Sequence, residues 1–140
     1  MPGRTNCRVI RIEFGNCDPA KIVYYPNYVA WIDQSTHHLF EAAGVPLREL
    51  QTRLGLHAPI VDLSVKFLGP AAWGDLIEIE SSIGRWGSKS FDVVHHISDV
   101  ATKAAIAEAR ETRVCAETDP NEPKKLRAQA IPKVVRQAFE

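Results

Sequence analysis

Several features are missing from this sequence, and each absence excludes a class of protein. No apolar run approaches the roughly 20 residues that a helix needs to cross a bilayer, and the first seven residues lack the apolar stretch of a signal peptide. Lysine and arginine together number 17, as do aspartate and glutamate, so no overall positive field attracts nucleic acid. We therefore expect a protein that acts on neither a membrane nor a nucleic acid.

Cysteine is scarce as well. Cys7, Cys17 and Cys115 are odd in number and show no C-x-x-C spacing. This pattern fits reduced thiols, so we expect a cytoplasmic protein. The chain also lacks a G-x-S-x-G elbow, a Walker loop, a G-x-G-x-x-G fingerprint and an H-E-x-x-H zinc motif. Serine-hydrolase and nucleotide-dependent functions are therefore not favoured, and we expect neither a cofactor nor a metal.

A loop that carries one carboxylate is the most informative segment. Residues 14–21 read Phe-Gly-Asn-Cys-Asp-Pro-Ala-Lys and place Asp18 between a strand-like run and a predicted helix. Taken alone, an Asp-Pro pair usually marks only a turn. Beside a helix N-terminus, such a carboxylate can act as a nucleophile or a general base, while backbone N–H groups of the helix end stabilise a developing oxyanion. The loop is therefore a candidate centre for acyl-transfer chemistry.

The longest predicted helix follows this loop. Pro26 suits its first turn, Gly44 is typical of a helix end, and Pro46 prevents continuation. A second, short helical stretch is expected near residues 47–54. One stripe of the long helix, at spacings of four, three, four and three, is predicted to face the core: Tyr28, Ile32, Ser35, Leu39 and Ala42.

The remaining pattern mainly predicts strands. Residues 7–14 alternate, with Cys7 and Val9 on the apolar face, and residues 76–83 alternate more cleanly. Further strands are expected over residues 60–68, 90–97 and 104–116. One long helix followed by strands with hairpin-length connections indicates the α+β class with an antiparallel sheet, in a single domain over residues 1–140.

The C-terminal part begins with a polar, proline-rich segment. Residues 119–123 predict a loop that leaves the last strand. Residues 124–127, Lys-Lys-Leu-Arg, follow this loop as a basic run. We expect the terminal segment either to form a partial helix or to lie flat on the body of the protein.

Two other groups of residues have side chains that can carry chemistry. Cys17 could attack a thioester as a thiolate, but no histidine stands in a recognisable motif with it. Adjacent histidines occur at residues 37–38 and 95–96, and neighbouring side chains on a helix or strand point away from each other. Neither pair has metal-ligand spacing. Catalysis by Cys17 and a metal site are therefore not favoured.

The ordered set of motifs resembles the 4-hydroxybenzoyl-CoA thioesterase family of the hotdog-fold superfamily. The specific part is F-G-x-C-D-P-A over residues 14–20, followed by Y-P-N-Y over residues 25–28. Weaker matches keep the family's order along the chain: residues 11–13, 22–23, Trp31, Asp33, residues 59–61, Trp86, residues 89–91 and 126–128. The resemblance therefore spans nearly the whole sequence.

This resemblance implies a hotdog fold, in which an antiparallel sheet wraps around one long helix, and an acyl-CoA thioesterase that needs no cofactor. It assigns the chemistry to Asp18 and to the backbone N–H of Tyr25. Asp18 either attacks the thioester carbonyl directly or deprotonates water, and the Tyr25 N–H stabilises the oxyanion. We expect an aromatic acyl group, such as 4-hydroxybenzoyl or benzoyl.

The resemblance also points to substrate-binding residues at the acyl end. The family's aspartate that matches Asp33 lies near the aromatic acyl group, although Asp33 alone reads equally well as a polar residue on an exposed helix face. Ala58, beside Pro59, stands where a family member carries a hydroxyl residue that helps to hold a ring substituent. Because Ala58 cannot donate that hydrogen bond, the reaction type is better defined than the substrate.

Basic residues are expected at the coenzyme A end. A basic run such as residues 124–127 is often only a solvated surface. In the family, however, a nucleotide-contacting arginine matches Arg127, and another basic position matches Lys89. Two arginines that precede this lysine in the family are Gly87 and Ser88 here. We expect four residues near the coenzyme A phosphates: Lys89, Arg127, Arg85 and Lys125.

Two other functions are compatible with the hotdog fold. The alternatives are a thioesterase for aliphatic acyl-CoA or acyl-carrier-protein substrates and a non-hydrolytic hotdog dehydratase or binding protein. A dehydratase needs a histidine paired with a carboxylate at the site, and no histidine accompanies the Asp18 loop. Because hotdog chains pair to cover strand edges, we expect a homodimer as the minimum unit, a tetramer in solution, and active sites shared between chains.

Overall fold

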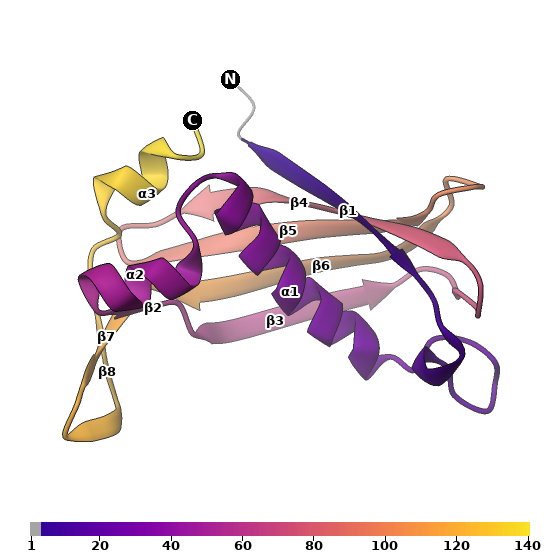
Figure 1. Ribbon diagram of the computed structural model, residues 1–140, viewed down its shortest axis with the longest axis horizontal. Coiled ribbons are helices and arrows are strands. Elements are labelled where there is room, and N and C mark those ends of the chain that lie inside the picture. Colours follow the sequence, from indigo (N-terminus) through magenta and orange to yellow (C-terminus); the bar gives the residue numbers. More distant parts are fainter. Residues whose placement is uncertain (1–3) are drawn as a thin grey trace.

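A five-stranded antiparallel sheet curves around one long helix in this protein (Figure 1). The computed structural model describes residues 4–140. The strands lie in the order β1-β4-β5-β6-β3, and every neighbouring pair is antiparallel. The elements of this main layer are β1 (Thr5–Arg11), α1 (Pro26–Ala42), β3 (Ile60–Phe67), β4 (Leu76–Trp86), β5 (Ser90–Asp99) and β6 (Ala105–Val114). The predicted α+β class is confirmed.

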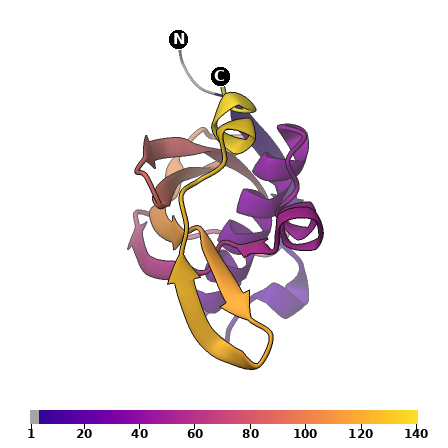
Figure 2. The same ribbon diagram turned by 90° about the vertical axis from the view of Figure 1, so that its left-hand side faces the viewer.

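A second, three-stranded sheet and two short helices gather at one end of the main sheet (Figure 1). The strands of this small sheet lie in the order β2-β7-β8, and β7 and β8 form a hairpin that projects from the body (Figure 2). A single 3-10 turn, η1 (Phe14–Asn16), lies at the opposite end (Figure 1). The elements around the small sheet are α2 (Leu47–Leu54), β2 (Leu56–His57), β7 (Ala116–Asp119), β8 (Glu122–Ala128) and α3 (Lys133–Gln137).

The predicted loop over residues 119–123 is wrong in its extent. The chain instead makes a tight hairpin turn, in which the Asn121 N–H donates to Asp119 Oδ1 at 2.9 Å. Residues 124–127, three of which are basic, consequently lie on β8. Every residue of β8 is exposed, so the strand has no alternation of buried and exposed residues. Its pairing with β7 is what makes it a strand. The partial C-terminal helix is confirmed as α3.

Helix α1 begins and ends where the sequence predicts. Pro26 occupies its first turn. At the other end, Gly44 adopts a φ of 83°, a left-handed conformation that glycine tolerates best. The Gly44 N–H donates to the Glu41 carbonyl and the Val45 N–H to the Phe40 carbonyl, both at 3.0 Å. These two bonds form a Schellman motif, which satisfies carbonyl groups that the helix end leaves free.

The buried stripe of α1 matches the prediction in four of five positions. Ala42 is exposed, so its assignment to the stripe is wrong. Beyond Leu39 and Phe40, the contact with the core passes to Ala43 instead. One residue and then three adjacent pairs, spaced three or four positions apart, make up the buried face: Tyr28, Trp31, Ile32, Ser35, Thr36, Leu39 and Phe40.

The two faces of β1 are the reverse of the expected ones. Cys7 and Val9 are exposed, whereas Arg8 and Ile10 lie on the half-buried face. Arg8 reaches α1, where its Nη1 donates to Ser35 Oγ at 3.4 Å. The alternation of β4 is as predicted, with Ile77 and Ile79 fully buried. Apolarity alone misassigned β1, because an arginine on the inner face can pack its aliphatic stem and still find a polar partner.

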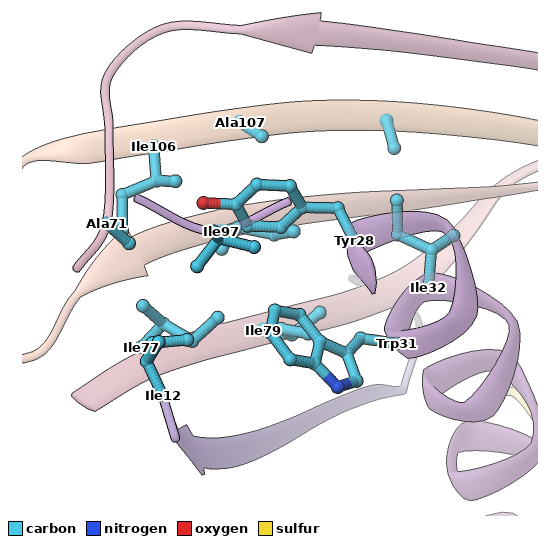
Figure 3. Close-up of a cluster of buried hydrophobic side chains, with 12 residues drawn as sticks. Ile12, Tyr28, Trp31, Ile32, Ala71, Ile77, Ile79, Ile97, Ile106 and Ala107 are labelled. Carbon is cyan, nitrogen blue, oxygen red and sulfur yellow. The ribbon is translucent and has the colours of Figure 1, made fainter. Parts of the chain in front are cut away.

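The core between α1 and the sheet consists of two apolar clusters separated by a polar belt. Figure 3 shows the first cluster, in which Tyr28, Trp31 and Ile32 of α1 point toward isoleucines of the sheet. The second cluster surrounds Phe40 and Phe91, near α3. We call the buried polar residues between them the polar belt: Thr36, Ser81, His95, Glu111 and Arg113. The three central strands, β4, β5 and β6, therefore each contribute belt residues between residues of the two apolar clusters.

No helix within residues 4–140 combines the length and the apolar character that a membrane crossing needs.

Candidate active site

The Asp18 loop lies between η1 and α1 and is held by backbone hydrogen bonds. The Asp18 N–H donates to the Ile22 carbonyl at 3.0 Å, and the Lys21 N–H donates to the Asp18 carbonyl at 2.8 Å. Lys21 closes this turn with a left-handed φ of 68°. Asp18 Oδ1 accepts the Ala20 N–H at 2.8 Å, and Oδ2 has no hydrogen bond within residues 4–140. The carboxylate is thus oriented and keeps one oxygen for chemistry.

The N-terminus of α1 adjoins this loop. The Asn16 carbonyl accepts the Tyr24 N–H at 2.9 Å and Asn27 Nδ2 at 2.8 Å, which ties the start of the loop to the first turn of the helix. Across residues 4–140, the Tyr25 N–H donates to no acceptor. A free N–H at the positive end of a helix is the kind of donor that stabilises an oxyanion.

Exposed aromatic side chains surround Asp18 and Tyr25. Phe14 and Trp73 contact each other edge to face, with ring centroids 5.5 Å apart, and line a groove over Asp18. A second groove lies beside Tyr25, whose ring centroid is 6.3 Å from that of Phe67. Phe14 is 73% exposed and Trp73 is 63% exposed. Large exposed apolar side chains beside a polar centre mark a binding surface.

Two neighbouring groups do not compete with Asp18 as reactive residues. Burial, and to a smaller extent the charges of Cys17 and Asp75, raise the pKa of Tyr28 to about 12, so its phenol stays protonated at neutral pH. The Cys17 thiol lies 3.7 Å from the Glu13 carbonyl, and no histidine contacts it within residues 4–140. Asp18 therefore keeps its place as the candidate nucleophile or base.

The residues predicted for the acyl end lie together around one arginine. Asp33, two turns into α1, is half exposed, and its Oδ1 accepts Arg113 Nη2 at 2.7 Å. The Ala58 carbonyl accepts Arg113 Nη1 at 3.0 Å. Pro59 follows, and its carbonyl accepts the Val114 N–H at 3.1 Å. Arg113 was not predicted from the sequence, although its side chain connects Asp33 and Ala58 to β6, while the next residue of the strand, Val114, holds Pro59.

Lys89 and Arg127 carry exposed charges on hairpins. Lys89 lies in the connection between β4 and β5, and Arg127 lies on β8. Within residues 4–140, neither side chain makes a salt bridge or a side-chain hydrogen bond. Both charges are therefore available to an anionic ligand.

Arg85 and Lys125, in contrast, already have partners. The Arg85 guanidinium donates to both Asp92 oxygens, at 3.2 and 3.1 Å, and Lys125 pairs with Glu122 at 3.5 Å. Burial alone would raise the pKa of Asp92, but hydrogen bonds from Arg85, Thr112 and Arg110 outweigh it and lower that pKa. A phosphate that recruited Arg85 would have to compete with this carboxylate.

The segments that carry the candidate catalytic residues and the basic residues lie at opposite ends of the main sheet (Figure 1). Tyr25 packs on Phe67, which pairs with Ala107 at the beginning of β6. The Lys89 carbonyl accepts the Cys115 N–H at 2.7 Å, just beyond the other end of β6. Eight residue steps separate Ala107 from Cys115, about 27 Å of extended chain.

The polar belt is a buried, hydrogen-bonded cluster that was not predicted from the sequence. His95 Nδ1 lies 2.7 Å from Ser81 Oγ, and its Nε2 lies 3.3 Å from Thr36 Oγ1 and 3.7 Å from Glu111 Oε1. The Thr36 hydroxyl also donates to Glu111. Burial alone would raise the pKa of Glu111, but hydrogen bonds from His95, Arg113 and Thr36 outweigh it, and the pKa falls below its ordinary value.

The alternation of β5 contained a signal for this belt. His95 falls on the same face as Val93 and Ile97, so an inward histidine was predictable from the strand period. The prediction that adjacent histidines point apart is confirmed here, because His95 is fully buried and the His96 side chain is 60% exposed. The His95–Glu111 pair cannot reach a substrate, so it gives no support to a dehydratase.

One cluster within residues 4–140 has the donor atoms of a metal site. Cys7, Glu78 and Glu80 bring their ligand atoms within 4.8 Å of one another on the outer face of β1 and β4. Burial, followed by a hydrogen bond and charge repulsion from Glu78, raises the pKa of the Cys7 thiol. A protonated thiol is a poor metal ligand. The cluster is also separate from the Asp18 loop and plays no part in the site.

Comparison with known proteins places the fold and the site in a family. A family model of the thioesterase-like superfamily matches residues 12–139. The 4-hydroxybenzoyl-CoA thioesterase of Pseudomonas sp. (strain CBS-3) is 36% identical over 127 residues, which cover 87% of this chain and 88% of that protein. The chain therefore belongs to the thioesterase-like superfamily.

Solved structures agree with this assignment. The crystal structure of an aspartate-to-asparagine mutant of 4-hydroxybenzoyl CoA thioesterase, complexed with 4-hydroxybenzoyl CoA, has a TM-score of 0.88 at 33% identity and covers 98% of this chain and 99% of that one. A gentisyl-coenzyme A thioesterase has a TM-score of 0.80 at 34% identity, with coverage of 94% and 99%. The predicted hotdog fold, family resemblance and enzyme class, an acyl-CoA thioesterase, are confirmed.

Proposed function

We propose that this enzyme hydrolyses an aromatic acyl-CoA thioester to the free acid and coenzyme A, with 4-hydroxybenzoyl-CoA and benzoyl-CoA as the first candidates. The observation that carries the proposal is the oriented carboxylate of Asp18 in the loop that leads into α1, where the Tyr25 N–H donates to no acceptor within residues 4–140. Two similar thioesterases act, by name, on 4-hydroxybenzoyl-CoA and gentisyl-coenzyme A, and both acyl groups are hydroxylated aromatic rings. This agreement supports an aromatic substrate.

In the proposed reaction, the thioester carbonyl oxygen binds the Tyr25 N–H. One donor of this kind lowers the barrier by about 2.7–4 kcal/mol. The Asp18 carboxylate either attacks the carbonyl carbon, expels the coenzyme A thiolate and forms a mixed anhydride that water opens, or takes a proton from the attacking water. One matched structure holds its substrate in an aspartate-to-asparagine mutant, which supports an essential aspartate.

Asp33, Ala58 and Pro59 are proposed to bind the acyl group. Asp33 lies eight residues beyond Tyr25, about 12 Å along the helix axis. This distance suits a single aromatic ring held by a hydrogen bond at each end. Ala58 adds no side-chain hydrogen bond, so its contribution is space and its backbone carbonyl, which Arg113 holds.

The basic residues are proposed to act on coenzyme A bound at another chain's Asp18. About 27 Å of strand separates Lys89 from the Tyr25 end of the same chain. A second chain can place its own Lys89 and Arg127 beside this end, with Arg85 and Lys125 nearby. Strand β3 is an open edge of the sheet and carries the exposed Ile60 and Val61, so it supplies a pairing surface. We infer a homodimer as the minimum unit and a tetramer in solution.

We also propose a cytoplasmic location. Cys7, Cys17 and Cys115 are all free thiols. Reduced thiols are the rule in cytoplasmic proteins. Fractionation of the native host, followed by detection of the protein, would test the location directly.

A thiol-release assay tests the proposed substrate class. The panel contains 4-hydroxybenzoyl-CoA, benzoyl-CoA, short and long straight-chain acyl-CoAs, and an acylated acyl carrier protein. We expect the highest kcat/KM for an aromatic member. A straight-chain or carrier-protein substrate with the highest value would replace the proposal with the aliphatic alternative, and no thiol release from any member would leave a binding protein.

A further inference from the structure

Arg113 is a buried branch point that connects three parts of the molecule. Its side chain, on β6, is only 6% exposed. Nε donates to Glu111 Oε1 at 3.1 Å, Nη1 to the Ala58 carbonyl at 3.0 Å, and Nη2 to Asp33 Oδ1 at 2.7 Å. All three guanidinium nitrogens are engaged, and Nη2 also donates to Glu111 Oε2 at 3.4 Å. The acceptors belong to β6 itself, to the connection between β2 and β3, and to α1. A planar fork of fixed donors is the feature that distinguishes arginine from lysine at such a position.

The core side of this branch point is rigid. Glu111 is fully buried and also accepts a hydrogen bond from Thr36, and it lies against His95. His95 is in turn held by Ser81 at 2.7 Å. A fully satisfied buried network fixes the rotamers of its members. The Arg113 guanidinium therefore cannot turn without breaking this network.

The solvent side of the branch point faces a surface groove. His37, Ala58 and Arg113 line this groove, and the half-exposed Asp33 lies next to two of these lining residues, Arg113 and His37. Asp33 Oδ1 is taken by Arg113, while Oδ2 lies 3.9 Å from His37 Nε2, beyond hydrogen-bond distance. One carboxylate oxygen is thus anchored and the other is open to accept a donor.

We propose that Arg113 is a positioning residue that sets the preference for acyl groups whose ring carries a hydroxyl donor. This inference rests on the proposed function. Arg113 holds the Asp33 carboxylate and the Ala58 backbone in one arrangement, so that Oδ2 of Asp33 accepts the ring hydroxyl. Ala58 has no side-chain hydrogen-bonding group, so discrimination falls to Asp33. A site built to bind a substrate hydroxyl rejects the analogue that lacks it, because its acceptor stays unpaired.

The test compares kcat/KM for 4-hydroxybenzoyl-CoA and benzoyl-CoA in the wild type and in Arg113→Lys. Lysine keeps the charge that Glu111 requires but cannot reach three acceptors at once. We expect the ratio of the two values to fall by about tenfold or more. Arg110→Lys is the matched control, because Arg110 lies on the outer face of the same strand and pairs with Asp92. Its ratio should equal that of the wild type.

A double-mutant cycle separates positioning from general support of the fold. Asp33→Asn should lower the same ratio. Adding Arg113→Lys to this variant should change the ratio by less than about twofold, because both substitutions remove the same interaction, the positioned Asp33 carboxylate. A purely structural Arg113 would instead lower both substrates' kcat/KM equally and leave the ratio unchanged. That result, or full additivity in the cycle, would overturn the inference.

Two further arms cover the remaining outcomes. If Arg113→Lys does not fold, the paired variant Arg113→Gln with Glu111→Gln removes both charges of the buried pair and takes its place in the cycle. If the wild-type enzyme releases no thiol from any acyl-CoA, the proposed function itself is contradicted. If the wild-type enzyme hydrolyses both aromatic substrates with equal kcat/KM, only the inference about Arg113 is contradicted.

Discussion

The two ends of this molecule hold their polar groups in different ways. At the Asp18 end, backbone hydrogen bonds fix the loop, and the free donor is a main-chain N–H whose direction the helix determines. At the Lys89 end, long side chains project from hairpins, and Lys89 and Arg127 have no partner within residues 4–140. The first end suits a reaction that requires direction, and the second suits attraction between charges.

This difference has a physical reason. An oxyanion develops at one point, so a donor must already be aligned with that point before the reaction begins. Phosphate groups are large, carry several oxygens and can be reached by a flexible cation from many directions. We therefore expect substitutions at the two ends to affect different kinetic constants.

The largest expected effect is that of Asp18→Asn. The substitution keeps the shape of the side chain and removes its charge, so acyl-CoA binding should stay near normal while kcat falls by about a hundredfold or more. Steady-state kinetics and equilibrium binding of an acyl-CoA measure the two quantities separately.

Asp99→Asn is the matched control for this variant. Asp99 also orients a turn through its carboxylate, because Oδ1 accepts the N–H groups of Ala101 and Thr102, both at 2.9 Å. It lies outside the Asp18 loop, so Asp99→Asn should leave kcat unchanged. An Asp18→Asn enzyme with more than a tenth of wild-type turnover would remove Asp18 from the chemistry.

Mixed oligomers test whether the two ends meet across chains. Asp18→Asn chains and chains with Lys89→Glu and Arg127→Glu should each be poorly active at low substrate concentration. After subunit exchange, random pairing makes half of the dimers mixed, with one intact site each, so activity should recover to about a quarter of the wild-type value. No recovery, together with proof of exchange, would place both ends of a site in one chain. Light scattering that gave a fully active monomer would exclude shared sites altogether.

A smaller effect is expected from acidification, through the polar belt between the two ends. The pKa of Glu111 is lowered in the folded protein, so its stabilisation is fully present above the ordinary value of 4.5 and is lost as the pH falls through the folded value. The melting temperature should therefore drop on acidification below about pH 4.5, and Glu111→Gln should show a shallower drop. Asp92→Asn, which removes another carboxyl with a lowered pKa, is the comparison variant. Parallel curves for wild type and Glu111→Gln would contradict this prediction.

The smallest effects are expected from single neutralisations at the basic end. Lys89→Ala and Arg127→Ala should each raise KM several-fold, a loss of about 1 kcal/mol, because solvent screens exposed charges. The effect should shrink as salt increases, since the Debye length falls to about 8 Å at 0.15 M. Wild-type KM values for both variants at low salt would move the phosphate site to Arg85 and Lys125.

Local features of the fold were predictable where one residue type has a single role. Pro26 and Gly44 mark the ends of α1 because their backbone preferences act within one turn. The Asp18 loop was recognisable because its residues are contiguous. The β7–β8 hairpin was not, since its exposed residues carry no burial pattern and its strands form only by pairing.

Features that depend on distant segments were harder to predict. Arg113 and Asp33 are 80 residues apart, and nothing in either local pattern indicates that they meet. The reversal of the β1 faces has the same origin, because Ser35 of α1 supplies the partner for Arg8. Pairing across the sheet decides such contacts, and a single sequence without its fold does not contain that pairing.

The polar belt also fixes the position of α1 along the sheet. Apolar side chains can slide past one another at modest cost, but a shift of α1 by one turn, about 5.4 Å, would carry Thr36 away from Glu111 and leave buried polar groups without partners. The belt therefore locks the register of the helix against the sheet. Because Tyr25 directly precedes this helix and Lys89 directly precedes strand β5 of this sheet, the fixed register also sets the separation between the two ends. Buried hydrogen bonds in the middle of the core thus hold the two functional ends at a constant distance from each other.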